Sequence, residues 1–161
     1  MTLRRMSDRG RELLTEWEGG VRLHEYLDPA GLPTIGVGHL IRHGEMLAGL
    51  QIDGRRVPYK DGISREDAMA LLEADLRWVE SLLNSRLALP LAQCEFDALC
   101  SLVFNIGPRR FLESTLLECL NAGNREAVPA QFRRWVNSEG QRLQGLVDRR
   151  DAEISLWEGK L

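Results

Sequence analysis

Apolar residues recur at intervals of three and four between residues 64 and 86, which is the spacing of one face of an α-helix. The segment begins with Ser64, and the acidic Asp67 follows three positions later, as in a capping box at a helix N-terminus. We therefore expect one long amphipathic helix over residues 64–86. Its apolar positions are Ala68, Leu72, Leu76, Val79 and Leu83.

A first helix is predicted near the N-terminus. Ser7 is a favourable N-cap, because its hydroxyl can accept a hydrogen bond from the first turn. The pair Gly19-Gly20 is expected to end this helix. Its apolar positions include Leu13, Leu14 and Trp17.

The chain beyond Pro90 is expected to be helical, with glycine-containing turns between the helices. Pro129 falls inside the third of these segments and should end or kink it, because proline lacks the N–H that an internal turn needs. The four predicted helices cover residues 91–106, 114–122, 125–137 and 144–158.

Short strands and turns are predicted between the first helix and the long one. Asp28-Pro29-Ala30-Gly31 is a typical turn, residues 33–37 predict a short strand, and Asp53-Gly54 predicts a β-hairpin. The expected fold class is therefore α+β.

The predicted elements fall into two lobes of a single domain of 161 residues. The N-terminal lobe, with the β region, is expected to cover about residues 12–63, and the helix at residues 64–86 to connect it to the second lobe. The helical lobe should cover about residues 87–161 and also include the N-terminal helix. A cleft between two lobes is the natural place for an extended ligand.

Composition excludes several classes of function. Apolar residues make up 43% of the chain and charged residues 28%, as in globular proteins. The net charge of −3 argues against a general nucleic-acid-binding role, because phosphate neutralisation needs clustered lysine and arginine. We expect a monomer without nucleic-acid partners and without stable insertion in a membrane, since no apolar run approaches the roughly 20 residues that span a bilayer.

Neither the cysteines nor the histidines suggest a redox or metal centre. The cysteines are odd in number and lack Cys-x-x-Cys spacing, so buried reduced thiols are expected at Cys94, Cys100 and Cys119. Glycine-rich turns separate the histidines, and we expect no metal and no cofactor. The histidines are His24, His39 and His43.

The segment from residue 18 to residue 39 carries the candidate chemistry. It combines two carboxylates, Glu18 and Asp28, with the hydroxyl of Thr34 and the imidazole of His39. Cleavage of a glycosidic bond needs one carboxylic acid to protonate the leaving oxygen and a second carboxylate opposite it. Glu18 lies at the C-terminal end of the first predicted helix, where the helix dipole disfavours a negative charge and so favours a protonated acid.

The same segment resembles the signature of the phage-type lysozymes, the endolysins of glycoside hydrolase family 24. The matching elements are Glu18-Gly19, Tyr26-Leu27-Asp28 and Thr34-Ile35-Gly36-Val37-Gly38-His39. Further segments in the same order are similar to the linker helix, the core of the helical lobe and the C-terminal block of that family. They are residues 63–76, 98–107, 111–117, 132–135 and 145–150.

The resemblance implies a lysozyme-like fold and a muramidase that lyses bacteria by cleaving the β-1,4 bond between N-acetylmuramic acid and N-acetylglucosamine of peptidoglycan. It assigns Glu18 as the general acid, and Asp28 with Thr34 as the groups that position water for an inverting reaction. His39, Tyr26 and Arg149 are then supporting residues, and Arg149 is expected to pair with Glu18. Substrate contacts are expected from Asn105, Asn137 and Ser138. A helix C-cap is the other interpretation of Asn105, and a turn explains Asn137 and Ser138 equally well.

One departure from the family pattern leaves alternatives open. The interval from Glu18 to Asp28 is one residue longer than usual, and Gly20 is the apparent insertion. A glycine can be absorbed at a helix end with little strain, although a shift of about 1 Å at a catalytic acid can cost about 100-fold in rate. The alternatives are a lytic transglycosylase on the same substrate, or a catalytically weakened murein-binding module.

The start of the chain suggests where such an enzyme is made. Basic residues at Arg4 and Arg5 are not followed by an apolar stretch, so no signal peptide is expected. We expect synthesis in the cytoplasm and action on the cell wall in the periplasm, after release through a separate pore or secretion system. A phage lysin and a secreted antibacterial effector both fit this description.

Overall fold

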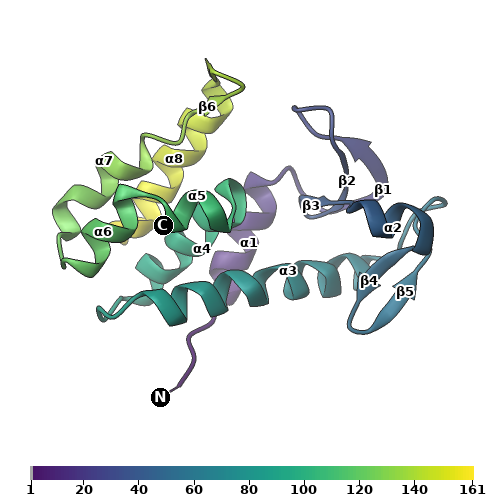
Figure 1. Cartoon of the computed structure of the whole chain (residues 1–161), viewed down its shortest axis with the longest axis horizontal. Helices are drawn as coiled ribbons and strands as arrows, with labels where there is room; N and C mark the ends of the chain where they lie inside the picture. The colour runs from purple at the N-terminus through teal and green to yellow at the C-terminus, as the bar shows by residue number, and fades with distance from the viewer. Residues whose placement is uncertain (1) are drawn as a thin grey trace. The chain divides into compact units, whose positions relative to one another are not determined.

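The computed structural model describes residues 2–161, and within them the chain forms two compact units. One unit is continuous and runs from Leu13 to Arg77; we call it the site unit. The other, the helical unit, combines the residues up to Glu12 with Trp78–Leu161. The division falls inside two helices, α1 (Asp8–Trp17) and α3 (Arg65–Arg86), which Figure 1 labels.

Both of these helices begin and end where the sequence predicts. The Ser7 Oγ accepts a hydrogen bond from the Gly10 N–H at 3.0 Å at the start of α1, and the Ser64 Oγ accepts one from the Asp67 N–H at 3.0 Å at the start of α3. Gly19 and Gly20 follow α1 with positive φ angles of 91° and 86°, a conformation that glycine adopts without strain. The predictions for these two helices are confirmed.

The site unit contains two small antiparallel sheets. β1 (Arg22–Leu27), β2 (Pro33–Gly36) and β3 (His39–Leu40) form one sheet in that order. β4 (Leu50–Ile52) and β5 (Arg55–Val57) form the other. The predicted turn is present, because the Gly31 N–H donates to the Asp28 carbonyl at 2.8 Å.

The core of the site unit lies between these strands and the first half of α3. Gly36 sits directly on α3, where a Cβ would lie 3.6 Å from Leu71. The buried residues that form this core are Ile35, Ile41, Leu50, Ile52, Val57, Tyr59, Ile63, Ala68 and Leu71.

A short helix in the site unit was not predicted. α2 (His43–Ala48) has six residues, and only Glu45 among them is buried. An amphipathic pattern over so few residues has too few apolar positions to stand out from a loop.

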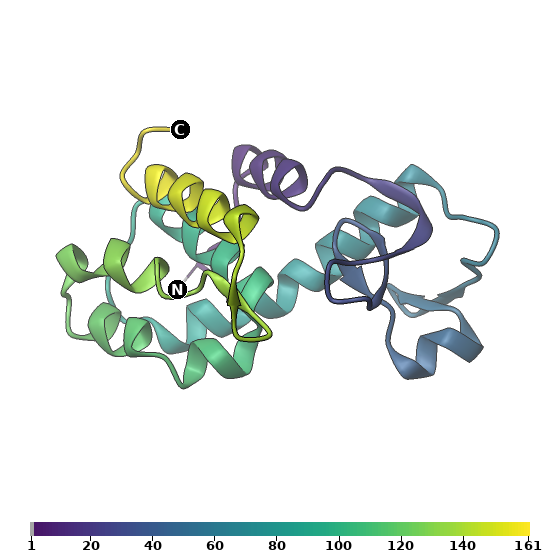
Figure 2. The ribbon, with the colours of Figure 1, turned by 90° about the horizontal axis from the view of Figure 1, so that it is seen from above.

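The helical unit is built on α4 (Gln93–Ile106), against which α8 (Gln144–Trp157) packs. Figure 2 shows α8 in yellow, preceded by a small hairpin. The remaining elements are α5 (Pro108–Leu112), α6 (Thr115–Asn121), the 3-10 turn η1 (Arg125–Ala127), α7 (Val128–Phe132) and the strands β6 (Asn137–Ser138) and β7 (Gln141–Arg142).

Two predictions for the helical unit are wrong. The helix expected over residues 125–137 is a 3-10 turn followed by α7, which ends at Phe132, and Pro129 stands in the first turn of α7, where its missing N–H costs nothing. The second is the interpretation of Asn105 as a helix cap. Gly107, with φ of 89°, is the C-cap of α4, and its N–H donates to the Val103 carbonyl.

All three cysteines are free thiols, but the expectation that all are buried is wrong for two of them. Cys100 is buried, whereas Cys94 and Cys119 are half-buried. Burial raises the pKa of the Cys100 thiol well above its ordinary value of 9.0, which keeps it protonated and unreactive.

Among residues 2–161, no helix combines the length and the apolar composition of a membrane span. Within the same range, no group of three or more His, Cys, Asp or Glu side chains could hold a metal ion.

Candidate active site

Glu18 stands at the C-terminal end of α1, and the glycine pair behind it closes the helix. The Gly20 N–H donates to the Thr15 carbonyl at 2.8 Å, and the Gly19 N–H donates to the Glu16 carbonyl at 3.0 Å. These two bonds make a Schellman motif, in which Glu18 is the C-cap residue. Gly20 is therefore an ordinary part of the helix end.

The Glu18 carboxylate lies directly against the backbone of Gly38. A Cβ built on Gly38 would stand 2.6 Å from Glu18 Oε2, closer than two such atoms can approach. Gly38 also has a φ of +63°, which other residues adopt only with strain. Glycine is thus required at this position for two reasons: the backbone angle of the turn after β2, and the space that the Glu18 carboxylate occupies.

Asp28 is held by the turn that it starts. Its Oδ1 accepts hydrogen bonds from the Ala30 N–H at 2.9 Å and from the Leu32 N–H at 2.8 Å. Both bonds reach the same oxygen, as in an Asx turn. The backbone fixes the carboxylate in one orientation.

Thr34 is fixed by the same turn. It lies in β2 opposite Tyr26 of β1 and is only 2% exposed. Its Oγ1 donates a hydrogen bond to the Leu32 carbonyl at 2.9 Å. Leu32 therefore holds both side chains, Asp28 through its N–H and Thr34 through its carbonyl. With its hydrogen committed, the Thr34 hydroxyl can still accept a hydrogen bond.

The charges of both candidate carboxylates affect the pKa of Tyr26. Burial raises the pKa of its hydroxyl, and the negative charges of Glu18 and Asp28 raise it further. Arg22 opposes them, because its guanidinium lies over the Tyr26 ring, 4.3 Å from the centroid. The two carboxylates are thus within electrostatic reach of a single phenol.

His39 is buried between two carboxylates of the site unit. Its Nδ1 is 2.7 Å from Asp75 Oδ2, and its Nε2 is 2.9 Å from Glu45 Oε2. An ionised carboxylate accepts and does not donate, so when both acids are ionised both ring nitrogens carry hydrogen and the ring is an imidazolium cation.

The pKa values of this buried group agree with that charge state. Burial lowers the pKa of His39, but hydrogen bonds and the charges of Asp75 and Glu45 outweigh burial and raise it above 6.5. Burial likewise raises the pKa of Glu45, yet bonds from Arg42, His39 and Gln51 lower it overall. His39 directly follows Gly38, so its contacts with Asp75 and Glu45 also fix the turn against which the Glu18 carboxylate lies.

The other candidate residues belong to the helical unit. Asn105 lies near the end of α4, where its Oδ1 accepts a hydrogen bond from Arg150 Nη2 at 2.7 Å. Asn137 and Ser138 form β6 and pair with Arg142 and Gln141 of β7.

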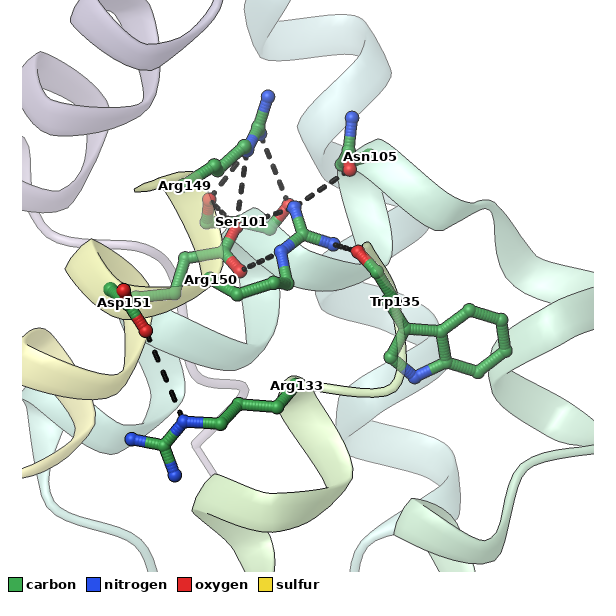
Figure 3. A network of polar contacts seen from close by, with 8 residues as sticks. Ser101, Asn105, Arg133, Trp135, Arg149, Arg150 and Asp151 are labelled. Atoms are coloured by element: carbon green, nitrogen blue, oxygen red, sulfur yellow. Dashed lines mark hydrogen bonds and ion pairs between the residues drawn. The ribbon is translucent and has the colours of Figure 1, made fainter. Parts of the chain in front are cut away.

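Arg149 is buried in the same unit. Its Nε donates to Glu153 Oε1 at 3.2 Å (Figure 3). The expected pairing of Arg149 with Glu18 stays a prediction.

Comparison with known proteins identifies the family. Residues 15–153 match the phage lysozyme family. The chain is 38% identical over 157 residues to the endolysin of Acyrthosiphon pisum secondary endosymbiont phage 1, covering 95% of this chain and 97% of that protein. This chain belongs to the phage lysozyme family.

Solved structures of similar proteins share its fold. A variant of P22 lysozyme superimposes with a TM-score of 0.77 at 37% identity, covering 96% of this chain and 99% of that one. The muramidase domain of SpmX from Asticaccaulis excentricus gives a TM-score of 0.75 at 32% identity, covering 96% and 98%. The α+β, lysozyme-like fold class is confirmed, and the protein is a peptidoglycan-hydrolysing enzyme.

The residues that hold the candidate groups of this phage lysozyme were not predicted from the sequence. Asp75 and Glu45 were not singled out. Asp75 follows Ala68 by seven residues and precedes Val79 by four, so an acid on the apolar face of the predicted helix was the signal of a buried partner. Glu153 was not singled out either, and Arg150 was noted only as part of the segment 145–150. A buried Arg-Arg pair followed by an acid one turn later in α8 is the pattern that could have revealed them.

Proposed function

We propose that this enzyme is a muramidase that hydrolyses the β-1,4 bond between N-acetylmuramic acid and N-acetylglucosamine. The observation that carries the proposal is that two carboxylates are held at the two ends of β2: Glu18 lies against Gly38 in the turn after the strand, and Asp28 is bonded to Leu32 directly before it. Glycoside hydrolysis requires such a pair. The similarity to a solved muramidase domain supports the same chemistry.

In the proposed reaction, Glu18 protonates the bridging oxygen as the bond to the anomeric carbon breaks. Glu18 is the C-cap residue of α1, and the hydrogen bonds of Gly19 and Gly20 fix the backbone from which its side chain extends. Gly38 leaves no room for the carboxyl group to move toward the backbone. The contact with Gly38 therefore restricts the direction in which Glu18 can transfer its proton.

Asp28 and Thr34 are proposed to hold the attacking water. The Thr34 hydroxyl gives its hydrogen to Leu32, so it can accept a hydrogen from water. Asp28 Oδ1 is bonded to the backbone, and Oδ2 can accept the second hydrogen. A water that donates both hydrogens presents a lone pair to the anomeric carbon, and Asp28 takes up the proton. Attack from the face opposite Glu18 inverts the anomeric configuration.

The Glu18→Gln variant tests the acid directly. It removes the transferable proton while keeping the shape of the side chain, so lysis of purified murein should fall at least 1,000-fold, roughly the contribution of general acid catalysis. Turbidity loss of peptidoglycan measures the rate. Glu16→Gln is the matched control, because Glu16 is an exposed neighbour on α1 and should not matter. Unchanged lysis by Glu18→Gln would contradict the proposal.

Product analysis separates hydrolysis from the transglycosylase alternative. Hydrolysis adds water and leaves reducing sugar ends, whereas a transglycosylase leaves anhydro ends that are lighter by one water. Mass spectrometry of digested murein should show reducing ends. The water-holding pair Asp28 and Thr34 favours this outcome, since a transglycosylase needs only the acid.

The proposed setting follows the relatives, which are endolysins. We propose that the enzyme is a monomer made in the cytoplasm, that it does not act on nucleic acid, and that it reaches the cell wall after release by a separate pore or secretion system. The Schellman motif absorbs Gly20, which supports an active enzyme over a weakened murein-binding module.

A further inference from the structure

A buried polar network lies at the centre of the helical unit. Glu153 is 0% exposed and Arg150 is 1% exposed. Glu153 Oε1 accepts a hydrogen bond from the Ser101 Oγ at 2.6 Å, and Glu153 Oε2 lies 2.9 Å from Arg150 Nε. A buried carboxylate is stable only when paired and hydrogen-bonded. Glu153 therefore fixes the Arg150 side chain from inside the unit.

Arg150 connects this buried charge to the surface. Its Nη2 donates to Asn105 Oδ1 at 2.7 Å, and its Nη1 donates to the Trp135 carbonyl at 3.4 Å. Arg150 thus joins the end of α4 to the segment that leads into β6 (Figure 3). In contrast to Arg150, Asn105 is exposed.

The contact with Arg150 determines which way the Asn105 amide faces. A guanidinium has N–H donors and no acceptor, so only the oxygen of the amide can face it. Figure 3 shows Asn105 Oδ1 toward Arg150 and Nδ2 pointing away from the network. The exposed end of Asn105 is consequently a hydrogen-bond donor and not an acceptor.

We propose that Arg150 is a positioning residue, which holds the Asn105 amide so that its NH₂ group donates a hydrogen bond to an N-acetyl carbonyl oxygen of the glycan. This inference rests on the proposed function. A carbonyl oxygen can only accept, so a fixed donor distinguishes it, whereas a sugar hydroxyl could pair with either end of an amide. Each sugar of the proposed substrate carries one N-acetyl group.

The Asn105→Asp variant separates a role in substrate binding from a role in folding. Aspartate keeps the oxygen that Arg150 binds and replaces the outward NH₂ by a second oxygen. We expect the Kd for an N-acetylglucosamine oligomer and the KM for N-acetylated murein to rise about tenfold, the effect of one lost hydrogen bond. The kcat and Tm should stay close to those of the wild type. On a de-N-acetylated oligomer, whose amino group is cationic, the variant should bind at least as well as the wild type.

Asn121→Asp is the matched control. Asn121 is also an exposed asparagine, and its amide nitrogen donates one hydrogen bond, to the Arg86 carbonyl at 3.0 Å. The same change of charge and shape there should leave the KM unaltered. A tenfold effect at Asn105 alone therefore reports the position of the donor.

Arg150→Lys tests the positioning itself. Lysine keeps a positive charge beside Glu153 but lacks the fork that reaches both Asn105 and Trp135. The KM should rise about fivefold with kcat unchanged, and the double variant with Asn105→Asp should have no higher KM than Asn105→Asp alone, because the two residues act through one donor. Additive effects on KM would contradict the positioning role.

Three outcomes at Asn105 would overturn the inference. They are an unchanged KM on N-acetylated murein, an equal rise in KM on N-acetylated and de-N-acetylated substrates, and a loss of kcat and Tm together. Failure of the proposed function is seen separately. If wild-type protein released no reducing ends while Asn105→Asp still weakened oligomer binding, only the muramidase proposal would fail.

Discussion

Gly38 and Glu18 constrain each other at the scale of single residues. The carboxylate occupies the space that a side chain at position 38 would need, and Gly38 has the backbone angle of a tight turn. A residue other than glycine would have to displace the acid or the turn. The second glycine of the Gly36-Val37-Gly38-His39 segment is thus explained by contact with the proposed acid as well as by backbone conformation.

The Gly38→Ala variant should lose most of its activity. The new Cβ would push Glu18 by about 1 Å, a displacement that costs about 100-fold in rate, and the left-handed backbone adds about 1–2 kcal/mol of destabilisation. Murein lysis and urea unfolding measure the two effects. Gly54→Ala is the control, because Gly54 has a φ of +77° with nothing within 4 Å of its Cβ position. Gly54→Ala should show the same loss of stability and retain its activity. Equal losses of activity in the two variants would contradict a role for the contact between Gly38 and Glu18.

The resemblance to known lysozymes indicates the candidate groups, while their supports depend on distant parts of the chain. Glu18, Asp28 and Thr34 lie within one short segment, so their spacing can be matched to a family. The partners of His39 are 36 residues away in α3 and six residues away in α2. No local pattern shows that an acid on a predicted helix will be buried against a histidine.

At the scale of secondary-structure elements, the buried group His39–Asp75–Glu45 connects one strand and two helices. His39 lies in β3, Glu45 in α2 and Asp75 in α3. Glu45 also accepts the N–H groups of Arg42 at 2.9 Å and Gln51 at 3.1 Å, on either side of α2. This anchoring explains why so short a helix is formed.

The contribution of this group to stability should depend on pH. The pKa of His39 is raised by folding, so its contribution is full below 6.5 and is lost as the pH rises through the folded pKa. The pKa of Glu45 is lowered, so its contribution is full above 4.5 and is lost as the pH falls through the folded pKa. The network therefore stabilises the protein most between pH 4.5 and 6.5.

The Asp75→Asn variant checks this dependence. At pH 5.5, removal of one charge from a buried pair should lower the free energy of unfolding by about 3–5 kcal/mol. Above the folded pKa of His39 the loss should shrink, because the ring is then neutral. Urea unfolding at pH 5.5 and pH 9 measures the difference. Asp53→Asn, which breaks the exposed Arg77–Asp53 pair, should cost less than about 1 kcal/mol at both values. A loss at Asp75 independent of pH would contradict the charge assignment.

Long elements were predicted better than short ones. α3 has 22 residues and α4 has 14, so their periodic apolar positions are numerous. β6 and β7 have two residues each, and the segment around Glu139 and Gly140 had only a turn signal. The hairpin is fixed by pairing of Asn137 with Arg142 and of Ser138 with Gln141, which a two-residue pattern cannot encode.

At the scale of the whole molecule, the first residues of the chain are anchored within the helical unit. The N–H of Arg4 donates to Asn84 Oδ1 at 3.0 Å, and the N–H of Met6 donates to Glu80 Oε1 at 2.9 Å. Ser7 donates both its N–H and its hydroxyl to Asp97. The acceptors stand on α3 and α4, so both ends of the chain contribute to one unit.

The Asp97→Ala variant should loosen this anchor. Asp97 is 3% exposed and accepts bonds from the half-buried Ser7 and from Gln93, so its loss should cost about 1–3 kcal/mol in all, chiefly at Ser7. Tm should fall by several degrees, about 2–4 °C per kcal/mol for a chain of this size. Amide hydrogen exchange should rise in residues 4–7 and in α4. Unchanged exchange there would show that the segment is held by other contacts.

The continuous course of the site unit, Leu13–Arg77, has a consequence for biosynthesis. On the ribosome, Glu18, Asp28, Thr34 and the acids that flank His39 have all been synthesised once residue 77 is translated. Arg150 and Glu153, which stabilise the helical unit, are added more than 70 residues later. If the proposals hold, a nascent chain carries its cleavage groups well before the part that orients Asn105, so truncated translation products would have the acid without the ordered donor.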